Sequence, residues 1–119
     1  TSMRSAVSMP MTALETQIIG WIVDRTTSSE LKRQLRGAEV ARRDYVRTGY
    51  FVYLHPAEGF SAIEGRPKIQ HPFIKSPALP DGAGCSLILK DGRVHYLEIY
   101  ARGGFFPENL VDYELRPES

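Results

Sequence analysis

The sequence has a single cysteine, Cys85, among its 119 residues, so an intrachain disulfide is impossible. One lone thiol is typical of a reducing compartment, and we expect a cytoplasmic protein. Long apolar runs are also missing. The segment Ile18–Val23 is far shorter than the roughly 18 to 20 residues of a membrane span, and nothing before Pro10 resembles a secretory signal. These absences argue against a membrane protein.

An excess of charge of one sign is missing as well. The chain carries 15 basic and 14 acidic residues, a formal net charge of +1. No strong field therefore recruits nucleic acid or an anionic membrane, and neither is expected as a partner. With 42% hydrophobic and 24% charged residues, the composition is that of a globular protein. We expect one domain over residues 11–119, preceded by a disordered or extraneous segment, residues 1–10.

The first element that the sequence predicts is a helix over residues 13–24. Thr12 and Glu15 have the spacing of a capping box, in which each residue's side chain bonds the other's backbone N–H. Apolar residues then recur at helical spacing, which places Trp21 in the core. Gly20 within this helix indicates close packing against another element.

A second, short helix follows and then β structure. Thr27 and Glu30 repeat the capping pattern, and Gly37 ends the helix. The later β-prone runs are 40–46, 50–54, 68–76, 85–90, 93–100 and 111–115. Helices first and strands afterwards predict an α+β fold, with one or two N-terminal helices packed on an antiparallel sheet of about five strands.

The strongest local signal is the pair Asp91-Gly92 between two β-prone runs, which predicts a type I′ hairpin turn. A regular ladder from this turn pairs Cys85 with Glu98 on one face and places His95 on the other. Glu98 is the main anomaly of this register. It is either a desolvated carboxylate that can act as acid or base, or a structural carboxylate near the sheet rim, bonded to backbone N–H groups or to an arginine.

Catalytic and metal-binding signatures are lacking. Beside Glu98, the Cys85 thiol is kept protonated, and we expect an inert buried cysteine. His55, His71 and His95 share no local metal-ligand spacing, so neither a metal site nor a cofactor is expected.

Two aromatic features remain. Phe105 and Phe106 follow two glycines and either fold back onto the core or anchor a partner. Arg42, Arg43 and Arg47 alternate with tyrosines over residues 42–53, a composition that single-stranded nucleic-acid binders use. A solvated strand face, on which the arginines face Asp44 and Glu39, explains it better.

Five stretches together resemble a family of small uncharacterised bacterial domain proteins. Arg43–Tyr45 and Thr48–Phe51 are similar to its R-E/D-x-T-G-x-G-F-F block. Gly82–Gly92 and Leu97–Tyr100 are similar to G-x-G-F-x-L-F-I-x-D-G-x-I-x-x-L-E-G-Y, and Gly104–Leu115 to the W-P-x-x-I ending.

Two positions depart from this family pattern. Cys85 stands where an aromatic residue is usual, and Phe106 stands where tryptophan is usual. Both exchanges are apolar and concern packing. The resemblance implies no activity and no catalytic residue.

These observations favour a non-enzymatic binding module that acts through a sheet face or the Phe105-Phe106 turn, with a protein partner or a second copy as its ligand. The alternative is a small-molecule pocket between helix and sheet, possibly enzymatic, centred on Glu98 with His95, Tyr96 and Tyr100.

Overall fold

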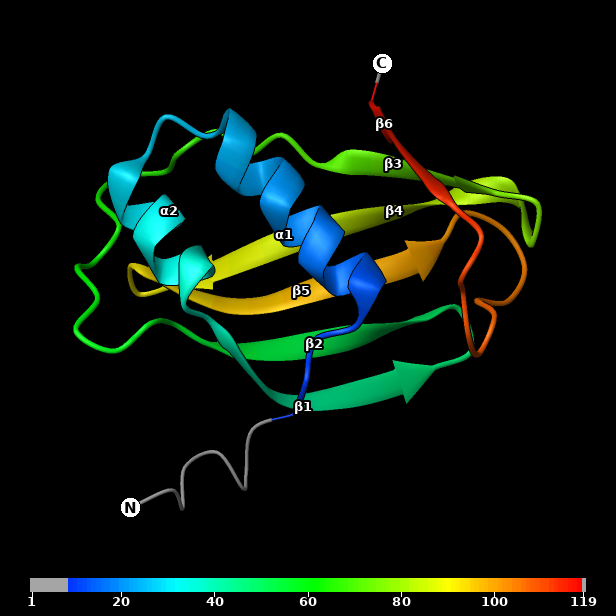
Figure 1. Cartoon of the computed structure of the whole chain (residues 1–119), viewed down its shortest axis with the longest axis horizontal. Helices are drawn as coiled ribbons and strands as arrows, with labels where there is room; N and C mark the ends of the chain where they lie inside the picture. The colour runs from blue at the N-terminus through cyan, green and yellow to red at the C-terminus, as the bar shows by residue number, and fades with distance from the viewer. Residues whose placement is uncertain (1–8, 119) are drawn as a thin grey trace.

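The computed structural model describes residues 9–118 and confirms the α+β prediction (Figure 1). Within this range two helices precede six strands. Their bounds are α1 (Ala13–Arg25), α2 (Ser29–Arg36), β1 (Glu39–Val46), β2 (Gly49–His55), β3 (Pro72–Ser76), β4 (Leu79–Lys90), β5 (Arg93–Ala101) and β6 (Glu114–Pro117). The expectation for residues 1–8 lies outside the described residues. Met9, from the same stretch, forms an isolated bridge to Val40.

Side chains fix the start of each helix. At α1 the capping box is complete, because the Thr12 hydroxyl accepts from the Glu15 N–H at 3.1 Å and the Glu15 carboxylate accepts from the Thr12 N–H at 3.0 Å. At α2 the predicted cap, Thr27, is wrong by one residue. Ser28 is the cap, and its hydroxyl accepts from the Leu31 N–H at 3.2 Å.

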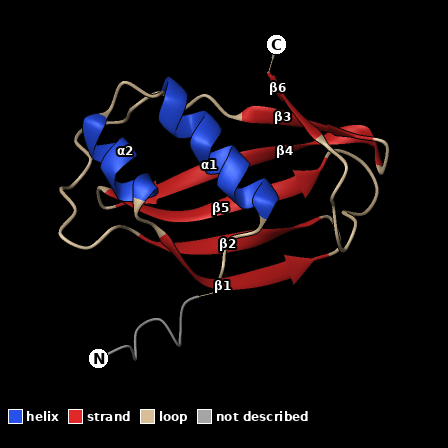
Figure 2. Cartoon of the chain, in the orientation of Figure 1, coloured by secondary structure: helices blue, strands red, loops and turns tan. Residues whose placement is uncertain are grey.

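The six strands form one antiparallel sheet in the order β1-β2-β5-β4-β3-β6. Short turns join β1 to β2, β3 to β4 and β4 to β5. Two longer connections complete the sheet: residues 56–71 cross from β2 to β3, and residues 102–113 cross from β5 to β6 (Figure 2). The second connection matters most here, because it borders the candidate site.

Both helices lie on one face of the sheet (Figure 1), and the core lies between them and that face. Its largest fully buried side chains come from both layers and include Ile18, Ile22, Leu31, Leu35, Ile74, Leu97 and Ile99. Gln34 joins the layers: its amide group donates to the Ser61 and Gly92 carbonyls and accepts from the Val94 N–H.

Two predictions about α1 are wrong. Trp21 is half-buried and lies outside the core, with the Arg25 guanidinium 3.3 Å above its ring. The buried stripe of the helix takes in Ile19 and Val23, which turns Trp21 to the margin. Gly20 is not closely packed, because a Cβ built there meets nothing within 4 Å.

The predicted hairpin turn is confirmed, but the predicted register beyond it is wrong. Asp91 and Gly92 have φ of 54° and 75°, as a type I′ turn requires. The ladder then slips: Leu89 pairs with Val94 but Ile88 pairs with Tyr96, which leaves His95 as the extra residue of a β-bulge.

Beyond His95, the side chains of β5 face the opposite way from the prediction. Cys85 pairs with Ile99, whereas Glu98 pairs with Ser86. The physical reason is burial. A regular ladder would turn Glu98 toward the helices and Leu97 toward water, and the bulge avoids both costs.

Within the described residues, no helix has the length and apolar character needed to span a membrane.

Candidate functional site: a cleft between the first helix and the sheet

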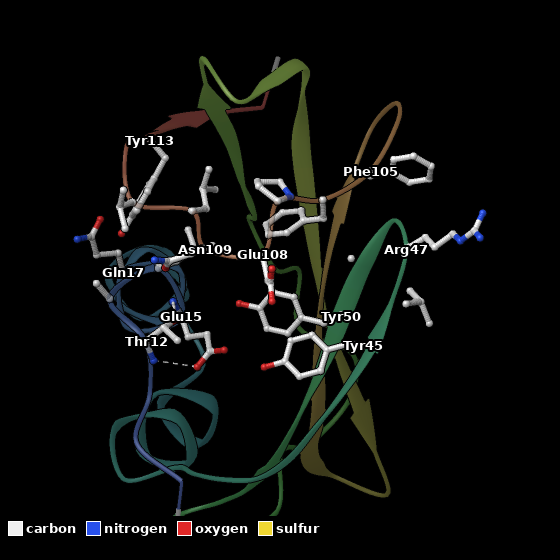
Figure 3. A pocket seen from close by; sticks show the side chains of 18 residues that line it. Thr12, Glu15, Gln17, Tyr45, Arg47, Tyr50, Phe105, Glu108, Asn109 and Tyr113 are labelled. Atoms are coloured by element: carbon white, nitrogen blue, oxygen red, sulfur yellow. Dashed lines mark hydrogen bonds between the residues drawn. The ribbon is translucent and has the colours of Figure 1, made fainter.

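A cleft of about 1190 Å³ opens at the end of the sheet where the β1–β2 turn lies. Its walls are the start of α1, the ends of β1 and β2, and the connection between β5 and β6. Figure 3 shows the tyrosines of β1 and β2 facing α1 across this space. Its lining residues are Thr12, Ala13, Leu14, Glu15, Gln17, Tyr45, Val46, Arg47, Gly49, Tyr50, Phe105, Phe106, Pro107, Glu108, Asn109, Leu110, Val111 and Tyr113.

Glu15, one of the lining residues, forms a buried ion pair with Arg43 of β1. The Glu15 carboxylate is only 1% exposed and accepts two hydrogen bonds from Arg43, at 2.8 Å from Nε and 2.6 Å from Nη2. Arg43 also donates to the Pro10 carbonyl at 2.8 Å. The hydrogen bond to Glu15 raises the pKa of Arg43 and holds its charge. Because the two charges match, the Glu15–Arg43 pair presents no net charge to a ligand.

Tyr50, another lining residue, lies beside this pair. Burial raises the pKa of Tyr50, and the neighbouring Glu15 carboxylate raises it further, so the phenol stays protonated. Its ring stacks on Tyr45 at 5.3 Å between centroids and meets the edge of Phe106 at 5.8 Å. The protonated phenol offers the cleft a hydrogen-bonding group and apolar ring surface.

Phe105 and Phe106 have different environments. Phe106 folds back onto Tyr50, and its N–H donates to the Arg47 carbonyl at 3.0 Å. Phe105 is 69% exposed at the edge of the site. Both Phe105 and Arg47 point away from the interior of the cleft (Figure 3), and the Arg47 guanidinium lies 5.8 Å from the Phe105 ring.

Exposed apolar side chains gather at this one place. Among residues 9–118, six large hydrophobic residues are exposed, and four of them line the cleft: Tyr45 (71%), Val46 (54%), Phe105 (69%) and Val111 (77%). A concave site edged by exposed apolar groups is typical of a binding surface.

The other predicted site residues lie elsewhere. Tyr96, Glu98 and Tyr100 are on the sheet face opposite the helices, and so is His95, whose ring contacts Tyr96 at 5.2 Å. Glu98 does not line the cleft. The β-bulge separates these residues from the helix side, where the sequence analysis placed Glu98 beside the thiol.

Cys85 is buried on the helix side of the sheet, and its thiol donates to the Pro72 carbonyl at 3.5 Å. Burial raises the pKa of Cys85 to about 12, which keeps the thiol protonated and unreactive. No cluster of three or more histidine, cysteine or acidic side chains suited to a metal ion occurs in the part of the chain that the structure describes.

The arginines alternating with tyrosines in β1 and β2 have two different environments. Arg42 faces solvent and pairs with Asp44 at 3.2 Å, as expected for a solvated strand face. Arg43 faces the helix layer instead, where it holds Glu15. Alternation along the strand places the two guanidinium groups on opposite faces.

Comparison of the chain with protein-family models, curated protein sequences and solved structures gave no match. The resemblance to a bacterial family stays a prediction, and the site rests on its own geometry.

Sequence reasoning identified Phe105 and Phe106 but not the cleft that they border. Glu15 was assigned to the cap of α1 alone, and its partner Arg43 lies 28 residues away in the sequence. Tyr45 was assigned to a solvated face. A signal was available in Tyr45-Val46, two adjacent apolar residues at the turn end of an otherwise charged strand.

Proposed function

We propose that this chain is a non-enzymatic interaction module that binds a segment of a partner protein in the cleft between α1 and the sheet. The observation that carries the proposal is the gathering of exposed apolar side chains, Tyr45 and Val111 among them, around one concave site. Aromatic side chains at a concave surface are the usual anchors of protein recognition.

The volume and charge of the cleft favour a peptide segment over a small metabolite. At about 1190 Å³ the space exceeds the usual range of small-molecule pockets, about 300 to 1000 Å³, and it is open along one side. The Glu15–Arg43 pair needs no counter-ion from a ligand. An apolar side chain of a partner can therefore lie against Glu15 without leaving that carboxylate unpaired.

A peptide-display library selected on the purified protein tests this function. We expect peptides with apolar anchors whose binding weakens at least about ten-fold in the Tyr45→Ser variant. Phe60→Ser is the matched control, because Phe60 is also an exposed aromatic but does not line the cleft, and this variant should bind as the wild type does.

Two results would contradict the proposal. One is selected peptides that bind both variants equally well. The other is a concentration-dependent dimer in sedimentation that Tyr45→Ser dissociates, which would assign the cleft to a second copy of the chain.

A further inference from the structure

The sheet face opposite the helices is aromatic where a solvent face is ordinarily polar. In Figure 2 both helices lie on the other side of the sheet, and no helix or strand within residues 9–118 covers this face. Half-buried side chains of β2, β4 and β5 occupy its centre: Phe51, Tyr53, Ser86, Ile88, Tyr96, Glu98 and Tyr100. This set is called the open face below.

Glu98 lies in the middle of the open face with aromatic neighbours on three sides. Phe51 is its partner across β2, and Ser86 is its partner across β4. Tyr96 and Tyr100 precede and follow it on the same face of β5, each about 7 Å along the strand. The Phe51 and Tyr96 rings meet edge to face with centroids 5.5 Å apart.

Tyr100 leans over the neighbouring strand because Gly84 has no side chain. A Cβ at Gly84 would lie 2.7 Å from the Tyr100 hydroxyl oxygen, so the ring occupies the space that another residue would fill. Ser86 adds only a small side chain next to it. Aromatic side chains thus lie on three sides of Glu98, and only the small side chain of Ser86 lies on the fourth.

No cation of the described residues pairs with the Glu98 carboxylate. The two guanidinium groups at the edges of the open face are already engaged: Arg42 with Asp44 at 3.2 Å, and Arg102 with Glu118 at 2.7 Å. A half-buried carboxylate among aromatic rings therefore lacks a counter-ion within residues 9–118.

We infer that the open face carries a second binding site, which takes an arginine or lysine side chain of a partner protein, with Glu98 as its counter-ion and Phe51, Tyr96 and Tyr100 as its walls. Aromatic faces attract a guanidinium or ammonium group, and arginine also stacks on them. The carboxylate adds the charge-assisted hydrogen bonds that fix the position of the cation. This site is on the opposite side of the sheet from the cleft and does not depend on it.

The negative charge of Glu98 argues against two other partners that bind aromatic surfaces, single-stranded nucleic acid and a second copy of this chain. Single-stranded nucleic acid would bring phosphates toward Glu98, while Arg42 and Arg102 are already paired. A second copy joined face to face by a two-fold axis near Glu98 would place two carboxylates together. A cationic side chain is instead attracted by the Glu98 carboxylate.

Titration of the isotope-labelled protein with a capped apolar peptide that contains one arginine tests the inference by NMR. We expect saturable shifts of the amide signals of Phe51, Tyr96, Glu98 and Tyr100. Replacement of the arginine by citrulline, its neutral analogue, should weaken binding at least about ten-fold, and so should Glu98→Gln. Asp44→Asn is the matched control, because Asp44 is a carboxylate on the same face that already has a partner.

The inference would be overturned by an absence of saturable shifts, by equal binding of the arginine and citrulline peptides to the wild type, or by unchanged binding to Glu98→Gln. Methylguanidinium alone serves as the further probe. If it bound as tightly as the peptide, the site would belong to small organic cations rather than to a partner protein.

Discussion

Arg43 of β1 holds Glu15 of α1 in a two-point ion pair that joins the helix layer to the sheet. The Nε and Nη2 atoms of Arg43 lie 2.8 and 2.6 Å from the two carboxylate oxygens of Glu15. The same carboxylate also accepts the Thr12 N–H, so one side chain both begins the helix and anchors it to β1. This link lies beside the cleft, because Glu15 also lines it.

Arg43→Met is expected to destabilise the protein by about 3 to 5 kcal/mol, because it leaves the buried Glu15 carboxylate without its cation. Arg42→Met is the control: its pair with Asp44 is exposed, so the loss should stay below about 1 kcal/mol. Urea unfolding of both variants measures the difference. Equal losses would show that the buried pair has no special role.

Two glycine substitutions should act in opposite directions. A Cβ at Gly49 would lie 2.0 Å from the Ile99 carbonyl oxygen, and a backbone atom cannot move aside, so Gly49→Ala should cost at least about 1 to 3 kcal/mol. Gly20→Ala should stabilise α1 by about 1 kcal/mol, since its Cβ meets nothing. Thermal unfolding compares the two, and a stable Gly49→Ala variant would refute the close approach of β2 and β5.

His71 should make stability depend on pH. Its Nε2 accepts from the Leu87 N–H at 2.9 Å, which requires the neutral ring, and burial lowers the pKa of His71 in the folded state. The unfolded chain therefore binds this proton more readily. The contribution of the neutral His71 ring to the free energy of unfolding is complete above the unfolded pKa of about 6.5. It is lost as the pH falls through the lower folded pKa.

Urea unfolding between pH 7.5 and 5 checks this pH dependence. The His71→Gln variant keeps an acceptor at this position but has no titrating group, so its stability should change less over that window. A wild-type curve with the same slope as the variant would contradict the assignment.

Cys85 should resist thiol reagents in the native protein, because burial raises its pKa to about 12. We expect labelling by a disulfide reagent to follow the opening of the sheet and to become rapid in urea. Fast labelling of the folded protein would show that the thiol is accessible.

Local chemistry made part of this fold predictable. The Thr12 and Glu15 spacing and the Asp91-Gly92 turn each act over four residues or fewer, and both predictions are confirmed. The bulge at His95 was not predictable in this way. The bulge determines which β5 residues face the helices, and the favoured arrangement depends on packing across the whole domain.

The candidate site was less predictable than the fold. Phe105 and Phe106 were recognised because two aromatic residues after two glycines stand out in the sequence. The cleft beside them needs α1, β1 and the 102–113 connection to come together, and the Glu15–Arg43 pair joins residues with no local relationship. Tertiary structure alone creates both.

The extra residue of β5 makes one point in this strand tolerant of deletion. Removing His95 would leave a regular ladder in which Val94 and Leu97 still face the helices. Removing Glu98 instead would turn Ile99 outward and Tyr100 inward. Deletion of His95 is thus expected to leave the fold intact, whereas deletion of Glu98 is expected to disrupt it.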